Sequence, residues 1–119
     1  MVISLMLTAM AAMAVPASIH EVALLDQAPF YSAGPTVTVA VGDTVRWKNP
    51  MTKDGAMHTV TQMGCLTGDA CEFDSGVMAP GAEFSHVFVQ AGAYRYRCRL
   101  HAPMEGVIVV NGQGGKAAQ

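Results

Sequence analysis

Short runs of β-forming residues, separated by Gly, Pro, Asp and Asn, recur along most of this 119-residue chain. In residues 36–41 (TVTVAV) valines alternate with Thr and Ala, so the valines share one face of an extended strand. Gly42 and Asp43 then supply a turn, after which Val45 and Trp47 continue the buried face. Helical periodicity is hard to find after the N-terminal segment. The pattern therefore predicts an all-β domain.

Further strands are expected around residues 58–62 and at residues 83–90, 93–98 and 107–110. Residues 49–56 and 64–78 contain the turn-forming residues between them and are expected to be loops. Several short strands with turn signals at this spacing favour an antiparallel sandwich or barrel over a fold built from βαβ units.

The N-terminal segment is uncharged and ends in small residues, as a secretory signal peptide does. We expect residues 1–17 to be cleaved, residues 18–111 to form one domain and residues 112–119 to be a mobile tail. A spanning helix needs about 20 apolar residues, and Pro16 shortens this run. Because no Lys or Arg precedes the run, an N-terminal membrane anchor is the alternative. The expected location is periplasmic or secreted.

The formal net charge of -2 and the charged fraction of 13% show no basic excess. Proteins that bind nucleic acid usually concentrate positive charge on one face. We therefore expect no nucleic-acid partner, and we expect a monomer.

The chain contains three cysteines. Cys65 and Cys71 lie close together in a polar, Gly-containing loop, and we predict that they form a disulfide. Cys98 is then left over. An odd cysteine in an oxidising compartment indicates an intermolecular bridge, a reactive thiol or a metal.

The neighbours of Cys98 favour a metal. Cys98, His101 and Met104 follow one another at intervals of three residues and offer a thiolate, an imidazole and a thioether. Two His and one Cys with a weakly bound Met are typical of blue copper, because soft sulfur favours Cu(I) while imidazole serves both oxidation states. The best second imidazole is His58, about 40 residues upstream. We therefore expect one copper ion, held by His58, Cys98, His101 and Met104.

The order of these motifs resembles that of the plastocyanin and amicyanin group of cupredoxins. The segments that carry the resemblance are VGDTVRWKN, HTVT, FDSGVMAPGAEFSHVF and YRYRCRLHAPMEGVIVV, and the short gap between His101 and Met104 is similar to an amicyanin-type loop. The resemblance implies a Greek-key β-sandwich of about eight strands with one type 1 copper centre. It also implies an exported one-electron carrier that serves redox partners.

Two residues are expected to support the ligands. Thr59 stands where members of the family often have Asn, so the bracing of the ligand loop by an Asn side chain is not carried over to this chain. The main-chain N–H of Thr59 can still reach the thiolate. Asn49 is a candidate brace for a loop. The resemblance further implies that His101 reaches the surface through an apolar docking face that includes Ala102, Pro103, Met57 and Pro80.

Arginines alternate with inward-facing residues just before the ligand loop. Because Arg95, Arg97 and Arg99 alternate with Tyr94, Tyr96 and Cys98, they should point outward if Cys98 points inward. One interpretation is a solvated strand face. The other is a positive surface for an acidic redox partner, such as a cytochrome or a dehydrogenase, and we adopt it as the expectation.

Two other functions compete with the electron carrier. An oxidase or nitrite reductase of this fold needs more ligands than His20 and His86, and Tyr94 stands where a binuclear centre would place a second cysteine. We therefore expect no enzyme. A copper carrier or storage protein is the other alternative, suggested by the methionines at Met51, Met57, Met63 and Met78.

The two remaining histidines have their own interpretations. Cleavage after Ala17 would leave His20 third in the mature chain, where it could bind Cu(II) with the terminal amine, although an ordinary strand residue is the simpler interpretation. His86 shares a predicted strand face with Phe84 and Phe88 and is expected to be structural.

Overall fold

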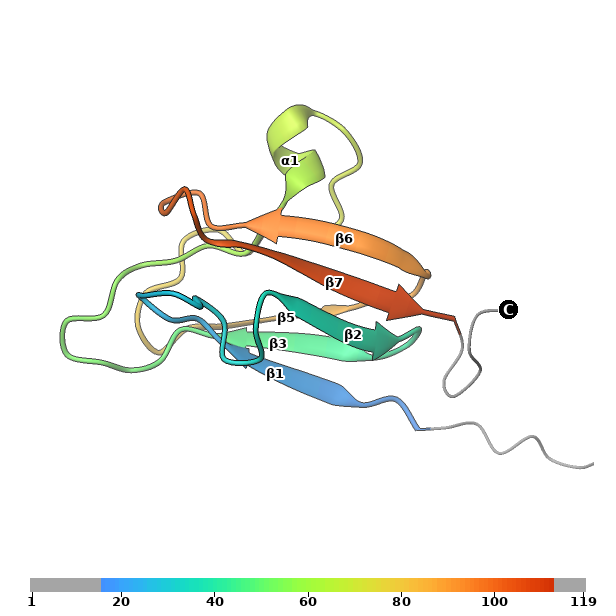
Figure 1. Cartoon of the computed structure of the whole chain (residues 1–119), viewed down its shortest axis with the longest axis horizontal. Coiled ribbons are helices and arrows are strands. Elements are labelled where there is room, and N and C mark those ends of the chain that lie inside the picture. The colour runs from blue at the N-terminus through green and yellow to red at the C-terminus, as the bar shows by residue number, and fades with distance from the viewer. Residues whose placement is uncertain (1–15, 113–119) are drawn as a thin grey trace, which may run out of the picture.

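Two β-sheets stack on each other, and the segments at residues 49–60 and 98–104 lie at the same end of the stack (Figure 1). The structure is a computed structural model that describes residues 16–112. One sheet contains β1 (Ile19–Ala23), β3 (Thr44–Lys48) and β5 (Glu83–Val87), in that order. The other contains, in order, β2 (Thr36–Ala40), β7 (Glu105–Asn111), β6 (Gly92–Arg97) and β4 (Thr61–Gln62). Most of the expected signal segment and tail lies outside the described residues.

The all-β sandwich is confirmed, but its sheets are mixed rather than wholly antiparallel. β1 pairs with β3, and β2 pairs with β7, in parallel. The other pairs, β3 with β5, β6 with β7 and β4 with β6, are antiparallel. The chain changes sheets between β1, β2 and β3, so a strand's neighbour in space is often not its neighbour in sequence. Such crossed connections are typical of a Greek-key arrangement.

Trp47 is the centre of the core between the two sheets. Its ring stacks on Phe73 and Phe84 and meets Tyr96 edge-on, with centroid separations of 5.4–5.9 Å. Its Nε1–H donates to the Tyr96 hydroxyl at 3.2 Å. Burial raises the pKa of Tyr96 to about 12, so this hydroxyl stays neutral at physiological pH. The predicted alternation is confirmed through β2 and β3, since Val37, Val39 and Val45 are buried like Trp47, while Val41 is only half-buried.

The segment after residue 57 differs from its predicted course. The strand expected around residues 58–62 is reduced to β4, and His58 forms an isolated antiparallel bridge with Met78. A short helix, α1 (Met63–Thr67), begins one residue before the expected loop, occupies its first residues and buries none of its own. A helix this short and exposed has no apolar stripe for the sequence to reveal. None of the helices formed by residues 16–112 is long and apolar enough to span a membrane.

The predicted disulfide is confirmed, because Cys65 of α1 is bonded to Cys71 in the segment after it. The helix ends at Gly68, whose φ of 81° is left-handed and reverses the chain toward Cys71. A loop this short gains little entropic stabilisation from closure. The disulfide therefore acts locally, on the segment that returns to the core at Phe73.

Candidate metal centre

The structure brings three potential metal ligands together at one end of the sandwich. The ligand atoms of His58, Cys98 and His101 all lie within 4.8 Å of one another, and they form the candidate metal group found among residues 16–112. The Cys98 Sγ atom is 4.0 Å from His58 Nδ1 and 3.5 Å from His101 Nδ1. Both imidazoles thus present the same nitrogen to the sulfur. His58 and Cys98 are fully buried, and His101 is half-buried.

Met104 closes the ligand loop on the same side. Cys98 follows the end of β6 and Met104 precedes the start of β7, and these two strands are antiparallel neighbours. The Cys98 N–H donates to the Met104 carbonyl at 3.0 Å, and the Met104 N–H donates to the His101 carbonyl at 2.9 Å. The Met104 side chain is fully buried. Hydrogen bonds within its own backbone thus hold the loop folded. The Cys98 sulfur and the His101 imidazole of this loop lie near His58, the candidate ligand from another part of the chain.

A buried amide side chain secures the loop that leads to His58. Asn49 is 2% exposed, and its Nδ2 donates to the Ala56 and Met78 carbonyls, both at 2.9 Å. The backbone of Met78 in turn pairs with that of His58, through hydrogen bonds of 3.1 and 2.7 Å. Asn49 therefore joins the two segments that hold His58. The sequence had left the partners of Asn49 undetermined.

Two backbone amides point at the Cys98 sulfur. The N–H groups of Thr59 and Leu100 lie 3.3 and 3.4 Å from Sγ. Hydrogen bonds of this kind, from the backbone to a ligand atom, tune a bound metal. The contact from position 59 is the one expected from the sequence, whereas the contact from Leu100 was not foreseen.

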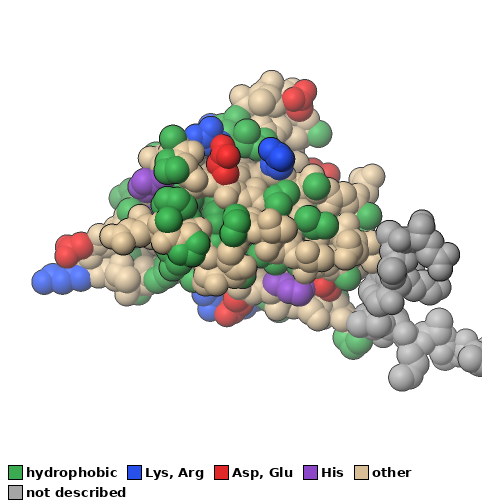
Figure 2. Space-filling model, in the orientation of Figure 1, with side chains coloured by type: hydrophobic (Ala, Val, Ile, Leu, Met, Phe, Trp, Pro, Cys, Tyr) green, Lys and Arg blue, Asp and Glu red, His purple; other side chains and the backbone are tan. Residues whose placement is uncertain are grey.

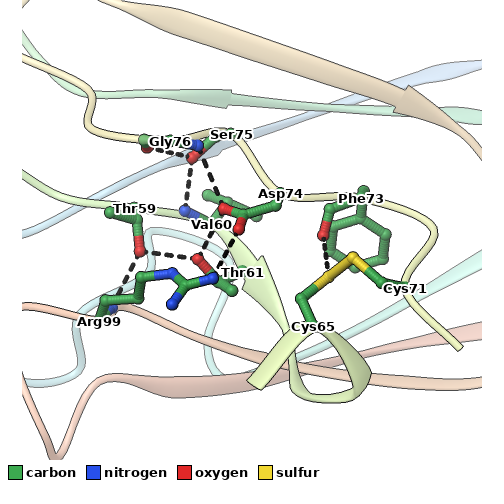
Figure 3. A network of polar contacts seen from close by, with 10 residues as sticks. All are labelled: Thr59, Val60, Thr61, Cys65, Cys71, Phe73, Asp74, Ser75, Gly76 and Arg99. Atoms are coloured by element: carbon green, nitrogen blue, oxygen red, sulfur yellow. Dashed lines mark hydrogen bonds and ion pairs between the residues drawn. A yellow bond between two sulfur atoms is a disulfide. The ribbon is translucent and has the colours of Figure 1, made fainter. Parts of the chain in front are cut away.

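The Thr59 side chain supports the ligand loop even though it replaces an Asn (Figure 3). Its hydroxyl accepts the Arg99 N–H at 2.9 Å and lies 2.9 Å from the Thr61 hydroxyl. Thr61 donates to Asp74, which also pairs with the Arg99 guanidinium at 2.8 Å. Burial opposes ionisation of Asp74, but hydrogen bonds from Arg99, Gly76 N–H and Thr61 outweigh it and lower its pKa. The residue after Cys98 is thus held by both its backbone and its side chain.

The ring of His58 has a partner that the sequence did not suggest. Its Nε2 lies 2.7 Å from Asp26 Oδ1, and Asp26 Oδ2 accepts the Ala56 N–H at 3.2 Å. The hydrogen bond with His58 and then that from Ala56 lower the pKa of Asp26. Asp26 precedes His58 by 32 positions, and no spacing motif links them.

Apolar side chains gather around the exposed edge of the centre. Ala102 and Pro103 are exposed, Met57 is 53% exposed and Pro80 is half-buried. Leu100, which is 52% exposed, adds an apolar side chain that the sequence analysis did not include. Figure 2 shows hydrophobic side chains clustered at the end of the molecule where the β6–β7 loop lies.

The three arginines differ in their surroundings. Arg95 is exposed, whereas Arg97 is half-buried and its Nη2 lies 3.5 Å from the Ala102 carbonyl. Arg97 is also opposite Glu105 in the β6–β7 register. Arg99 is paired with Asp74, so part of its charge is offset. The alternation with buried Tyr96 and Cys98 places all three away from the core, but they do not form a uniformly free positive stripe.

His20 and His86 lie in separate contacts. His20 Nε2 is 2.9 Å from Asp43 Oδ2, and Asp43 Oδ1 accepts the Ser18 N–H. His86 packs against the rings of Phe73 and Phe88, at centroid separations of 5.0 and 4.7 Å. Burial lowers the pKa of His86, as expected for an imidazole among aromatic rings. Neither histidine belongs to the group formed by His58, Cys98 and His101.

The donor set fits copper. A thiolate and two imidazole nitrogens already converge, and a buried thioether lies on the same loop. This combination is the one that type 1 copper sites use. Hard cations such as Mg²⁺ and Ca²⁺ require oxygen ligands instead, and no carboxylate belongs to the group among the described residues.

Comparisons with known proteins agree with this chemistry. Residues 26–111 match the family described as copper binding proteins, plastocyanin/azurin family. The chain is 34% identical over 76 residues to amicyanin from Paracoccus denitrificans, covering 64% of this chain and 55% of amicyanin. It is 33% identical over 82 residues to chloroplastic plastocyanin from Tetradesmus obliquus, covering 63% and 54%. The chain thus spans about half the length of these relatives.

A solved structure shows the same likeness at the level of the fold. The purple cupredoxin from Nitrosopumilus maritimus superposes with a TM-score of 0.63 at 27% sequence identity. The match covers 77% of this chain and 99% of that protein.

Proposed function

Because the chain belongs to the plastocyanin/azurin family of copper-binding proteins, we propose that it is an exported carrier of single electrons. It is a cupredoxin, and members of this family are electron carriers. The proposed ligands of one type 1 copper ion are His58, Cys98, His101 and Met104. Copper bound there would supply a one-electron Cu(II)/Cu(I) couple.

The convergence of three donor atoms, from His58, Cys98 and His101, is the observation that carries this proposal. Hydrogen bonds within the ligand loop fix Cys98 relative to Met104, and the bridge to Met78 fixes the backbone of His58. The fold therefore holds the backbones of these proposed ligands in place. A preformed site needs little ligand movement when the charge of the centre changes, which favours fast electron transfer.

The first test is a redox titration of purified protein loaded with Cu(II). We expect one copper per chain, an intense visible absorption band, and its reversible loss on addition of one electron per chain. Zinc as the tightly held native metal of the isolated protein, or a colourless Cu(II) form, would contradict the assignment. Zinc accepts the same donor types but has no redox chemistry.

Export is supported by the confirmed disulfide and the leader-like N-terminal sequence. Disulfides such as Cys65–Cys71 persist in oxidising compartments. We propose a periplasmic or secreted location, with an N-terminal anchor as the alternative, and a monomeric domain at residues 18–111. A carrier is proposed rather than an enzyme because His20 and His86 are engaged away from the metal centre.

Electrons would leave through the half-buried ring of His101. The apolar side chains around it form the proposed docking face, which consists of Ala102, Pro103, Met57, Pro80 and Leu100. A small apolar face suits a small, transient interface with a redox protein. Polar and charged residues flank it, as Figure 2 shows, and these would orient the partner.

We propose that Arg95 and Arg97 steer an acidic partner, such as a cytochrome or a dehydrogenase, while Arg99 mainly serves the Asp74 network. Reversing Arg95 and Arg97 to Glu should slow bimolecular electron transfer from an acidic cytochrome about tenfold or more at low salt. The salt dependence should flatten, because steering is screened over about 10 Å at 0.1 M salt. Stopped-flow kinetics at several salt concentrations measures both effects.

The matched control reverses Arg46 and Lys48 in β3, on the other sheet. It changes the net charge equally and breaks the surface ion pairs of Arg46 and Lys48 with Glu21 and Glu83, which contribute little stability. Equal slowing by both double variants would attribute the effect to net charge and reject a local steering surface.

A copper carrier is the second candidate function, because two thioethers are exposed in the loop that leads to His58. Met51 is 81% exposed and Met57 is 53% exposed, both in the loop that leads to His58. Thioethers are soft ligands for Cu(I). Ready transfer of Cu(I) to a chelator would favour carriage, whereas retention of copper through repeated redox cycles would favour the electron carrier.

A further inference from the structure

We propose that Asp26 is a positioning residue for the copper centre: its carboxylate fixes the tautomer of His58 and lowers the reduction potential of the site. The inference rests on the copper site proposed above. It assigns a role to a residue that belongs to neither the ligand loop nor the loop that leads to His58.

The contact is direct and lies on the far side of the ring from the sulfur. His58 Nδ1 is the nitrogen that faces Cys98 Sγ, at 4.0 Å, and Nε2 is the nitrogen that meets Asp26 Oδ1, at 2.7 Å. The His58 side chain is 1% exposed, while that of Asp26 is 44% exposed. Asp26 therefore lies between the buried ligand ring and solvent.

Asp26 is itself held in place by local structure. It follows β1, between Leu24 and Tyr31, which form an antiparallel bridge. The Leu25 N–H donates to the Phe30 carbonyl and the Phe30 N–H donates to the Gln27 carbonyl, so residues 24–31 form a closed turn. The second carboxylate oxygen accepts the Ala56 N–H at 3.2 Å. Both oxygens are thus directed by the fold, which argues against an incidental surface contact.

This arrangement has a chemical consequence for His58. A carboxylate can only accept, so the short contact requires a proton on Nε2 and leaves the Nδ1 lone pair directed toward Cys98. A carboxylate on the outer nitrogen also makes the imidazole a stronger donor. Its negative charge stabilises Cu(II) more than Cu(I), because Cu(II) carries the larger positive charge. The expected result is a lower reduction potential and tighter binding of Cu(II).

Asymmetry between the two imidazoles supports this role. No hydrogen bond to Nε2 of His101 is found among the described residues, and His101 is half-buried at the proposed docking face. His58 is buried, and its Nε2 contacts the carboxylate of Asp26. The carboxylate therefore lies on the buried ligand ring rather than on the ring of His101 at the proposed docking face.

The test compares Asp26→Asn, Asp26→Ala and the control Asp54→Asn. Asn keeps the size and an acceptor but removes the charge, and Ala removes both. Asp54 is an exposed acid four positions before His58, so its variant makes the same change in net charge. Measurements at neutral pH are the reduction potential, the affinity for Cu(II) by chelator competition, and the ¹⁵N shifts of the His58 ring in copper-free protein.

We expect Asp26→Asn to change the ratio of Cu(II) to Cu(I) affinities about tenfold in favour of Cu(I), which raises the potential by about 59 mV. Asp26→Ala should also weaken Cu(II) binding by about 10- to 100-fold. In copper-free wild-type protein the ¹⁵N shifts should show Nε2 protonated and Nδ1 unprotonated, and in Asp26→Ala this preference should weaken. Asp54→Asn should leave all three measurements close to wild type.

Each alternative result is decisive. If Asp26→Asn lowers thermal stability but leaves the potential equal to that of Asp54→Asn, Asp26 only fastens the loop and the inference is wrong. If the His58 ring shifts of copper-free Asp26→Ala match those of wild type, the tautomer role is wrong. Because those shifts need no metal, they test the role of Asp26 even if the protein fails to form a blue centre, which would instead overturn the proposed function.

Discussion

Replacing Cys98 by Ser is expected to abolish the intense visible band of the Cu(II)-loaded protein. In the proposed centre that band would arise from charge transfer from the Cys98 thiolate to copper, and a serine hydroxyl supplies no such donor. The other two cysteines, Cys65 and Cys71, are joined in a disulfide, so no other free thiol can take the place of the buried Cys98. An absorption spectrum of wild-type and variant protein at equal copper loading measures the effect.

The matched control removes the other two thiols. The double variant Cys65→Ser/Cys71→Ser loses the disulfide but leaves Cys98 and both histidines unchanged. It should retain the band, because neither Cys65 nor Cys71 belongs to the group formed by His58, Cys98 and His101. A band that survived Cys98→Ser would show that the thiolate is not a ligand and would overturn the centre proposed here.

Replacing Asn49 by Ala should destabilise the protein by about 2–4 kcal/mol. The change leaves the Ala56 and Met78 carbonyls without their side-chain donor, and an unsatisfied buried group costs about 1–3 kcal/mol. It also frees the two segments that hold His58, so copper affinity should fall as well. Equilibrium unfolding of the copper-free protein in denaturant separates the first effect from the second.

Asn111→Ala at the exposed end of β7 is the control for Asn49→Ala. Substitutions at exposed positions usually change stability by less than about 0.5 kcal/mol. If the two variants lost similar, small amounts of stability, the Asn49 side chain would not be an important brace, despite its burial.

The fold class followed from local pattern, whereas the pairing of strands did not. The alternating valines of residues 36–41 and the buried positions Val45 and Trp47 reflect the period of an extended strand, which is visible in any short window. The parallel pairs β1 with β3 and β2 with β7 join segments far apart in the chain. No window of sequence contains both partners, so a wholly antiparallel arrangement was the natural but incorrect expectation.

Elements with weak local signals were also missed. The helix α1 has five residues and no buried face, so it offers no helical period to detect. The strand expected around residues 58–62 is limited to β4, because the backbone N–H and carbonyl of His58 form hydrogen bonds with Met78 instead. The pairing of His58 with Met78 depends on the path of the segment that contains Met78, and the tertiary structure determines that path.

For the metal centre, the sequence by itself determined the chemistry of the donors. The three-residue spacing of Cys98, His101 and Met104, with an odd cysteine and an upstream histidine, indicated a soft, copper-type ligand set before any contact was known. This was possible because three donors share one short loop, so their proximity is imposed by the covalent chain.

Only the tertiary structure decided what surrounds those donors. Asp26 reaches His58 across 32 positions, Asn49 reaches Met78 across 29, and the Arg99 N–H reaches Thr59 across 40. These partners meet because of strand register and loop course, which arise from packing of the two sheets. Hydrogen bonds are short and directional, so a shift of one residue would break them. The sequence therefore determined which types of donor the proposed site contains. The fold determined the contacts that position and tune these donors.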